Sequence, residues 1–283
     1  MNHIKDQIHC ERAYRMGLSG KGIGVAVLDT GIFLHRDFDS RVTGFADMVN
    51  RRNFAYDDCG HGTHICGIIG GSGRMSGGRY SGIAPGCDLV MVKVLDRKGN
   101  GYSSDVLAGI SWILERKEKL GIRILNISVG ACSKRGMSEN SALVKGVNRA
   151  WDAGLVVVVA AGNNGPRTMS ITTPGISRKV ITVGCSDDDR EVLVGGNRMV
   201  DYSGRGPTAA CICKPDLVAP GCSVVSCSSR ADKYTIKSGT SMSTPIVSGA
   251  VALLLERFPD MSNKDVKLRL RESSVDIGLT RNQ

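Results

Sequence analysis

Residues 24–31 read Gly-Val-Ala-Val-Leu-Asp-Thr-Gly, and this stretch decides the class of fold. The consecutive apolar residues Val25–Leu28 are typical of a strand buried on both faces, as in a parallel sheet. Asp29 ends this predicted strand at the edge where parallel sheets bind ligands, and Gly31 lets the chain turn away sharply. Asp29 is therefore a candidate for orienting a catalytic partner, although an aspartate in this position also serves to cap the next element.

More short apolar runs follow the first, at residues 89–95, 122–127, 155–160 and 180–183. Segments with apolar residues at helical spacing lie among them, at 105–119 and 141–153. Gly121 and Gly154 stand just after these segments, where a glycine commonly ends a helix. Strands that alternate with helices predict an α/β fold with a mainly parallel central β-sheet and helices on both faces.

The carboxyl-terminal part predicts two more helices. The first covers residues 243–258 and ends at Pro259, with Pro245 in a first turn where it costs no helical hydrogen bond. The second follows Ser262, which has capping-box-like spacing to Asp265. No linker or repeat interrupts the chain, and the glycine-rich loop at 70–78 is too short to separate domains. We therefore predict a single domain over residues 1–283.

Composition and charge exclude several classes of protein. The first ten residues are too polar for a signal peptide, and the longest apolar run, 155–161, is far shorter than the roughly 18 residues of a membrane span. The net charge is 37 basic minus 27 acidic residues, or +10, but the basic residues are scattered and aromatic residues make up only 5%. We expect a cytoplasmic protein with no membrane partner and no nucleic-acid partner.

Ten cysteines are spread along the chain without a compact disulfide framework. A chain of this length does not need disulfides for stability, so we predict that most of the cysteines are free thiols in a reducing cytoplasm. If the protein were exported, up to five disulfides would be possible.

His61 lies in the stretch Gly-His-Gly-Thr-His-Ile-Cys-Gly at residues 60–67, at a predicted helix start. A general base must be accessible yet held in place, and the first turn of a helix suits both needs. A zinc site is the competing interpretation, because Cys59, His61, His64 and Cys66 place four soft ligands within eight residues. Their spacing matches no common zinc pattern, and a metal on His61 would disable the base.

Ser241 lies in the stretch Gly-Thr-Ser-Met-Ser-Thr-Pro at residues 239–245, at the amino terminus of a predicted helix. The positive end of the helix dipole favours negative charge developing there, although serine is also an ordinary helix cap. Asn163 follows the predicted strand at 155–160, where its amide could donate to an oxyanion. The local sequence Asn-Asn-Gly is equally typical of a simple turn.

Together these segments resemble the subtilisin-like serine proteases (peptidase family S8), which carry Asp, His and Ser in this chain order. The matching segments are Val-Leu-Asp-Thr-Gly-Ile at 27–32, Gly-His-Gly-Thr-His at 60–64, Ala-Gly-Asn at 161–163, Lys-Pro-Asp-Leu-Val-Ala-Pro-Gly at 214–221 and residues 239–245. The resemblance covers residues 21–258, taken as the catalytic core. It implies a three-layer subtilisin-like fold and a serine endopeptidase that forms a covalent acyl-enzyme.

The resemblance assigns a role to each candidate. Ser241 would be the nucleophile, His61 its general base, and Asp29 the group that holds the imidazole. Asn163 and the Ser241 backbone N–H would form the oxyanion hole. The family's substrate is an extended polypeptide, and the segments that would bind it here are Ser128, Val129 and Gly130 on one side, with Gly162, and Gly99, Asn100 and Gly101 on the other. An uncharged pocket at Gly130, 160–162 and Thr172 favours apolar or medium-sized side chains before the scissile bond.

Several features depart from the family pattern. No export signal or long pro-segment is recognisable, which resembles the intracellular bacterial branch. No metal and no cofactor is predicted for the chemistry. Residues 70–80 stand in place of the Asn-rich loop that commonly builds the family's strong calcium site, so a structural calcium is left open but its usual loop is not recognisable. Cys59 and Cys66 flank His61, which suggests that thiol reagents block the site.

Two other functions use the same residues. A catalytically silent module would keep the fold for binding, but its usual mark is loss of a triad residue, and none is lost here. An acyl transferase or cyclase would use the same Ser, His and Asp and differ only in excluding water. Oligomeric state and individual substrates are left open by the sequence.

Overall fold

The computed structural model describes residues 1–130 and 139–278 of the chain. Its backbone divides into two compact units, each assembled from separate stretches of sequence. The first unit contains residues 1–126, 225–236 and 248–260, and the second contains 127–224, 237–247 and 261–283. The prediction of a single domain over residues 1–283 stays a prediction.

The first unit is built on four strands in the order β2-β3-β1-β4. Their bounds are β1 Gly24–Asp29, β2 Val42–Asp47, β3 Asp88–Lys93 and β4 Ile122–Ile127. Strand β3 pairs in parallel with both β1 and β2, and its register places Asp29 beside Lys93. Every residue of β1 is buried, as its unbroken apolar sequence predicts.

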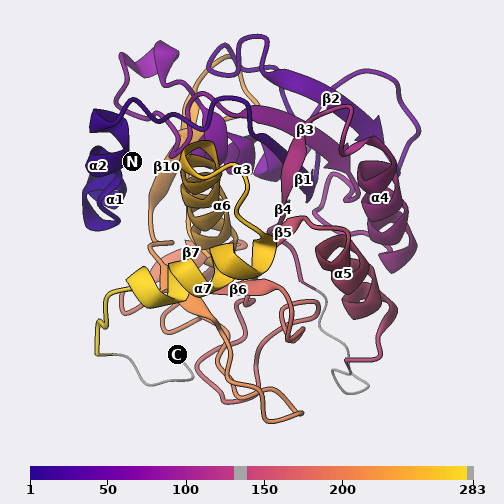
Figure 1. Cartoon of the computed structure of the whole chain (residues 1–283), viewed down its shortest axis with the longest axis vertical. Helices are drawn as coiled ribbons and strands as arrows, with labels where there is room; N and C mark the ends of the chain where they lie inside the picture. The colour runs from indigo at the N-terminus through magenta and orange to yellow at the C-terminus, as the bar shows by residue number, and fades with distance from the viewer. Residues whose placement is uncertain (131–138, 279–283) are drawn as a thin grey trace. The chain divides into compact units, whose positions relative to one another are not determined.

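Helices cover both faces of the sheet in the first unit. Helix α3 (His61–Gly70) lies against Met91, whereas α4 (Ser103–Arg116) lies against the next residue of β3, Val92. Because successive side chains of a strand point to opposite faces, α3 and α4 lie on opposite sides of the sheet (Figure 1). The unit also contains the 3-10 turn η1 (Arg74–Ser76), α1 Asn2–Gln7 and α2 Cys10–Arg15. Most of β10 Val224–Cys227 and β11 Tyr234–Lys237 belongs to it as well, apart from their end residues Val224 and Lys237.

The second unit repeats the arrangement on a smaller scale. Its parallel strands lie in the order β5-β6-β9, with bounds Val156–Ala160, Ile181–Cys185 and Leu217–Ala219. A short antiparallel hairpin joins β7 and β8, and α5 and α7 pack on β5; their bounds are β7 Val192–Val194, β8 Asn197–Met199, α5 Ala142–Asp152 and α7 Asn263–Ser273. Helix α6 (Thr240–Arg257) begins in this unit and continues into the first.

The structure confirms the strands and helices that the sequence predicts, with small shifts at their ends. Gly121 and Gly154 adopt positive φ angles of 58° and 92° after α4 and α5, as expected of glycines that end helices. One local prediction is wrong: α6 begins at Thr240, so Pro245 lies inside the helix and not in its first turn. Its ring nitrogen has no proton to donate to the Ser241 carbonyl four residues earlier, so one helical hydrogen bond is lost.

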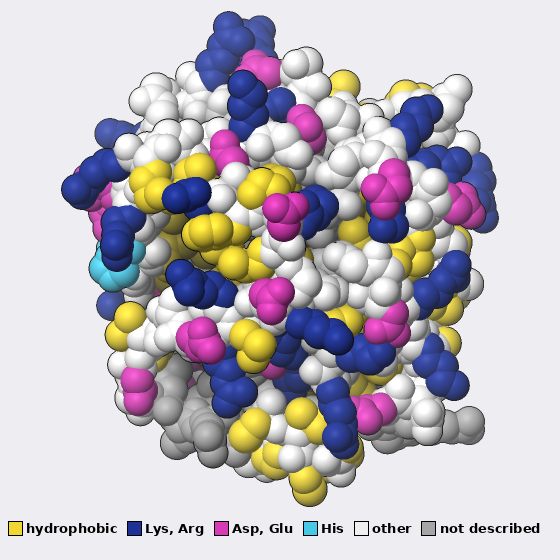
Figure 2. Space-filling view, in the orientation of Figure 1, with side chains coloured by type: hydrophobic (Ala, Val, Ile, Leu, Met, Phe, Trp, Pro, Cys, Tyr) yellow, Lys and Arg dark blue, Asp and Glu magenta, His cyan; other side chains and the backbone are white. Residues whose placement is uncertain are grey.

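The described residues contain no helix that has both the length and the apolar character needed to cross a membrane. On the face drawn in Figure 2, Lys and Arg side chains are interspersed with Asp and Glu and do not gather into one patch.

Asn263 ties α7 to the rest of the second unit, and this contact yields a first prediction. Its buried side-chain amide donates to the carbonyl oxygens of Trp151, at 2.7 Å, and Leu155, at 3.1 Å. We expect Asn263→Ala to lower the free energy of unfolding by about 2 kcal/mol, because two buried carbonyls lose their donor. Urea unfolding measures the change. The neighbouring exposed residue supplies the control, Lys264→Ala, and equal midpoints for the two variants would contradict this role.

Candidate active site

In the first unit the structure brings Asp29 and His61 together. Asp29 ends β1 and His61 begins α3, and the imidazole Nδ1 lies 2.7 Å from Oδ1 and 2.9 Å from Oδ2 of the carboxylate. The Asp29 side chain is fully buried, whereas that of His61 is 23% exposed. The carboxylate holds the proton on Nδ1, so Nε2 is the nitrogen that can act as a base.

Thr30 fastens the end of β1 to the start of α3. Its backbone N–H donates to Asp29 Oδ1 at 2.7 Å, and its hydroxyl accepts a hydrogen bond from the Gly62 N–H at 2.9 Å. The same hydroxyl donates to Asp57 Oδ1 at 2.9 Å. One residue therefore fixes the carboxylate and the first turn of the helix that carries His61.

Asp57 is a site residue that the sequence analysis missed. Its Oδ1 also accepts the backbone N–H groups of Cys59, at 3.1 Å, and Gly60, at 2.7 Å. Its Oδ2 accepts the N–H of Thr63 at 2.9 Å and the Thr63 hydroxyl at 2.6 Å. These bonds satisfy donors at the amino terminus of α3, as a capping carboxylate does. An aspartate shortly before a predicted helix start was the available signal.

Gly31 is required by a close approach of two backbones. It has a φ of +122° and forms a bridge with Asp57, and a side chain at this position would collide with the Tyr56 carbonyl. The sharp exit of the chain after Asp29 therefore depends on glycine, as the sequence predicts.

The ligands of the competing zinc interpretation do not converge in the structure. The clusters of metal-ligating side chains that the described residues form lie elsewhere. The His64 Nε2 lies 3.2 Å from the Thr235 carbonyl oxygen. Cys66 is fully buried, and burial raises the pKa of its thiol well above the ordinary value, with a further rise from Asp29. Of the two cysteines beside His61, only Cys59 is partly exposed.

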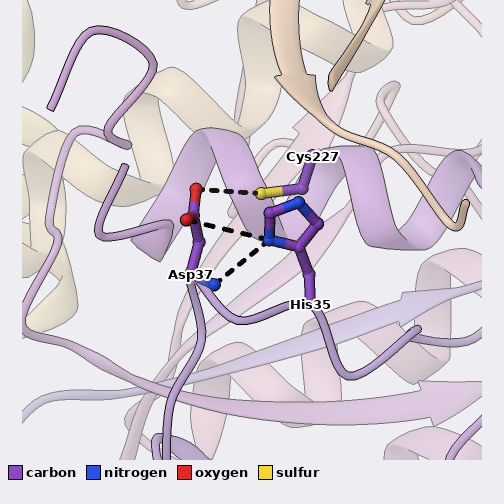
Figure 3. Close-up of side chains that lie close together, drawn as sticks. All are labelled: His35, Asp37 and Cys227. Carbon is purple, nitrogen blue, oxygen red and sulfur yellow. Dashed lines mark hydrogen bonds and ion pairs between the residues drawn. The ribbon is translucent and has the colours of Figure 1, made fainter. Parts of the chain in front are cut away.

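A cluster of His35, Asp37 and Cys227 lies near the segment that replaces the usual calcium loop (Figure 3). The Asp37 carboxylate accepts hydrogen bonds from the Met75 N–H at 2.9 Å and the Tyr234 hydroxyl at 2.7 Å, with the Cys227 sulfur at 3.6 Å. Calcium prefers six to eight oxygen ligands, whereas this cluster offers an imidazole and a thiol. These residues therefore do not fit a calcium ion.

In the second unit Ser241 is the second residue of α6. Its side-chain hydroxyl donates to the Ser128 carbonyl oxygen at 2.7 Å, and its side chain is partly exposed. The first turn of a helix has backbone N–H groups without helical partners, which favours negative charge close to this serine.

Asn163 is oriented by Thr240, which precedes Ser241. The Asn163 Oδ1 lies 3.0 Å from both the backbone nitrogen and the hydroxyl oxygen of Thr240. The Thr240 hydroxyl in turn accepts the Gly162 N–H at 3.2 Å. With its oxygen engaged in this way, the Asn163 side chain presents its NH₂ group as the donor. Thr240 is a second residue that the sequence analysis did not single out.

The predicted pocket residues also lie together in the second unit. Gly130 and Gly162 both pack against the Thr172 side chain, and a methyl group on either glycine would collide with it. The Thr172 hydroxyl donates to the Ala161 carbonyl oxygen at 3.3 Å. Val129 is partly exposed and Gly130 is exposed, so this edge is open to solvent.

The remaining predicted segment, Gly99, Asn100 and Gly101, is an exposed turn in the first unit. Asp96 closes it: its carboxylate accepts the N–H groups of Lys98 at 2.8 Å and Asn100 at 2.9 Å. These backbone hydrogen bonds lower the pKa of Asp96.

Residues 20–283 match the model of the subtilase family, peptidase S8. The chain belongs to the subtilase family. This is a family of serine endopeptidases, and the match covers both units of the structure.

Named relatives support the assignment. Serine protease AprX of Bacillus subtilis is 41% identical over 285 residues, an alignment that covers 94% of this chain and 64% of AprX. Subtilisin DY of Bacillus licheniformis is 33% identical, with 96% of this chain and 90% of the relative covered. This subtilase chain therefore spans slightly less than two thirds of AprX.

Solved structures confirm the predicted subtilisin-like α/β fold with its mainly parallel central sheet and helices. Sphericase superposes with a TM-score of 0.75 at 33% identity, over 91% of this chain and 84% of that protein. A cold-adapted subtilisin-like serine proteinase gives the same TM-score at 29% identity, over 93% and 86% of the two chains.

The family-like segment at 214–221 contains a buried lysine. The ammonium group of Lys214 donates to the Val180 carbonyl oxygen at 2.9 Å and pairs with Asp216 at 2.5 Å. Asp216 also pairs with Lys267 at 3.0 Å. Burial lowers the pKa of Lys214 from 10.5 to about 8, although the Asp216 charge opposes the shift.

This lowered pKa predicts a pH dependence of stability. Below about pH 8 Lys214 is protonated in both the folded and the unfolded chain. Between about pH 8 and pH 10.5 it is protonated mainly in the unfolded chain. The unfolded chain therefore binds more protons in that window, so the free energy of unfolding rises with pH. We expect the difference between the wild type and Lys214→Met to grow by about 2 kcal/mol from pH 7 to pH 10 in favour of the wild type. Urea unfolding at each pH tests this, and a constant difference would contradict it.

Proposed function

We propose that this subtilase cleaves peptide bonds with Ser241 as nucleophile, His61 as general base and Asp29 as the group that orients the imidazole. The hydrogen bond between Asp29 and His61 Nδ1, at 2.7 Å, carries the proposal, because it is the arrangement that prepares a histidine to accept a serine proton. The similarity to serine protease AprX, of which the chain covers 64%, supports the same activity.

In the proposed reaction Ser241 Oγ attacks the carbonyl carbon of the substrate while its proton passes to His61 Nε2. Asp29 then faces a cationic imidazole, and its buried carboxylate stabilises that charge without taking the proton. The tetrahedral intermediate collapses when His61 protonates the leaving amine, and an acyl-enzyme remains on Ser241. A water molecule reverses these steps and releases the acid. Ser241 Oγ must first leave the Ser128 carbonyl to which it donates.

The developing oxyanion would be held by the Asn163 NH₂ group and the Ser241 backbone N–H. Thr240 supports this role because it engages the Asn163 oxygen with two donors and so leaves the NH₂ group for the oxyanion. The amino terminus of α6 adds the positive end of its dipole at the same place.

We propose an extended polypeptide as substrate, bound along 128–130 and 99–101 by main-chain hydrogen bonds. The exposure of Gly130 and of the turn at Gly99–Gly101 supports this. The contacts of Gly130 and Gly162 with Thr172 support an uncharged pocket for an apolar or medium-sized side chain before the scissile bond.

We also propose that the enzyme works in the cytoplasm without a cofactor for its chemistry and without a nucleic-acid or membrane partner. No two cysteines within residues 1–130 and 139–278 form a disulfide, which suits a reducing compartment, and Cys132 lies outside those residues. The mixed charges on the face in Figure 2 support the absence of a nucleic-acid site there.

A fluorophosphonate reagent tests the nucleophile. We expect one covalent adduct on the wild type and none on Ser241→Ala, measured by intact mass. The control variant Ser243→Ala should label normally, since that neighbouring hydroxyl donates to the Ala219 carbonyl oxygen at 2.8 Å and faces the interior. No adduct on well-folded wild type would replace the peptidase proposal with a silent binding module.

A second test addresses the oxyanion hole. We expect Asn163→Ala to lower kcat by about 100-fold or more with little change in KM, because the amide acts mainly in the transition state. A steady-state assay on an extended peptide separates the two constants. A rise in KM at unchanged kcat would instead make Asn163 a residue of substrate binding.

A further inference from the structure

Two cysteines of the second unit share one tyrosine hydroxyl. The sulfurs of Cys185, the last residue of β6, and Cys222, shortly after β9, each lie 3.1 Å from the Tyr202 hydroxyl oxygen. Together with a carboxylate oxygen of Asp187, the two sulfurs lie within 4.8 Å of one another. Strands β6 and β9 are paired, which fixes the backbone on both sides of the thiol pair.

The two thiols have different surroundings. Cys185 is buried, and its thiol donates to Asp187 Oδ1 at 3.1 Å. Cys222 is partly exposed, and its interactions with the neighbouring Cys185 thiol and, to a smaller extent, the Tyr202 hydroxyl lower the pKa of its own thiol. The interaction with Cys222 and burial raise the pKa of Cys185. Cys222 is therefore the more accessible and more acidic thiol, which an oxidant meets first, and Cys185 is the buried, less acidic thiol behind it.

Asp187 holds the segment that carries Cys222 in place. Its Oδ1 accepts the Gly221 N–H at 2.7 Å and the Cys222 N–H at 3.1 Å, as well as the Cys185 thiol. This oxygen already has three donors, so the cluster is better suited to thiol chemistry than to a metal ion.

The pair is connected by backbone hydrogen bonds to both groups proposed to act on the substrate carbonyl. The Gly221 carbonyl accepts the Gly239 N–H at 3.0 Å, two residues before Ser241. The Tyr202 carbonyl accepts the Gly165 N–H at 2.9 Å, two residues after Asn163. Movement of Cys222 or Tyr202 would therefore displace the segments that position Ser241 and Asn163.

We propose that Cys185 and Cys222 form a reversible disulfide under oxidation by a hydroperoxide, and that this disulfide lowers the activity; the second part rests on the proposed function. The Cys222 thiolate attacks one oxygen of hydrogen peroxide, the O–O bond breaks, and the hydroxide that leaves takes up a proton to become water. Cys185 then loses its proton, and its sulfur attacks the Cys222 sulfenic acid and displaces a second water. Two electrons pass from the thiols to the peroxide.

Closing the disulfide requires local movement. A disulfide bond holds its sulfurs about 2 Å apart, so the thiols must leave Tyr202 and Asp187 to join. Asp187 then loses the Cys185 donor, and the loop at 221–222 shifts toward β6. Because small displacements of catalytic groups reduce rates strongly, we expect about a tenfold fall in the rate of Ser241 labelling.

Peptide mapping without reductant tests the bond itself. The Ser241→Ala chain is treated with hydrogen peroxide, so that self-cleavage does not interfere and the result does not depend on the proposed function. A cross-linked pair of peptides containing Cys185 and Cys222, which separates on reduction, is expected. In Cys185→Ser, a sulfenic acid at Cys222 should be trapped by dimedone. Absence of the cross-linked pair would overturn the proposal.

Fluorophosphonate labelling tests the effect on activity. Peroxide should slow labelling of the wild type about tenfold, and dithiothreitol should restore it. Cys222→Ser, checked for an unchanged melting temperature, should resist peroxide, whereas the control Cys59→Ser, beside His61, should lose activity as the wild type does. The reverse pattern, or a full cross-link at an unchanged rate, would overturn the regulatory role. No labelling of reduced wild type would instead refute the proposed function.

Discussion

The buried carboxylate of Asp29 is the constraint on which the rest of the site depends. A charge without exposed surface is stable only when hydrogen bonds replace the water that it has lost. Here the Thr30 N–H and His61 Nδ1 supply them at 2.7 Å each. His61 must therefore begin α3 at the end of β1, which requires the turn at Gly31 and the cap by Asp57. The need of the buried Asp29 carboxylate for hydrogen-bond donors thus sets the position of His61, the proposed general base.

In the second unit, hydrogen bonds restrain Asn163 and Ser241 to different degrees. Thr240 fixes the Asn163 amide oxygen with two donors, whereas the hydroxyl of Ser241, the next residue, donates to the Ser128 carbonyl oxygen. This difference suits the proposed roles of Asn163 as oxyanion donor and Ser241 as nucleophile. An oxyanion donor is effective when it is oriented before charge develops, because no reorganisation is then needed. A nucleophile must exchange its hydrogen-bond partner in each cycle, so a hydroxyl that is not held by several partners at once suits it.

The sequence predicted the parts of this structure that depend on local pattern. The apolar run of β1, the helix-ending glycines and the start of α3 follow from hydrophobic spacing and from glycine chemistry, and the structure has them. Strand β2 was missed because it is only partly buried, so its sequence carries no clear apolar run. Asp57 and Thr240 were missed because their roles arise from partners brought close by folding, and Asp57 bonds Thr30 across 27 positions. Family signatures gave the proposed roles of Asp29, His61 and Ser241, which no local pattern contains.

The cysteines show how one residue type takes different roles within one fold. Burial is the main cause that raises the pKa of Cys66, Cys87 and Cys227, and such thiols act as small apolar side chains. At Cys222 the interactions with Cys185 and Tyr202 outweigh burial and lower the pKa. Composition cannot separate these cases, because the neighbours that decide the pKa, Cys185 and Tyr202 for Cys222, are brought close only by folding. What distinguishes them is whether the neighbouring group donates a hydrogen bond to the sulfur or only removes water from it.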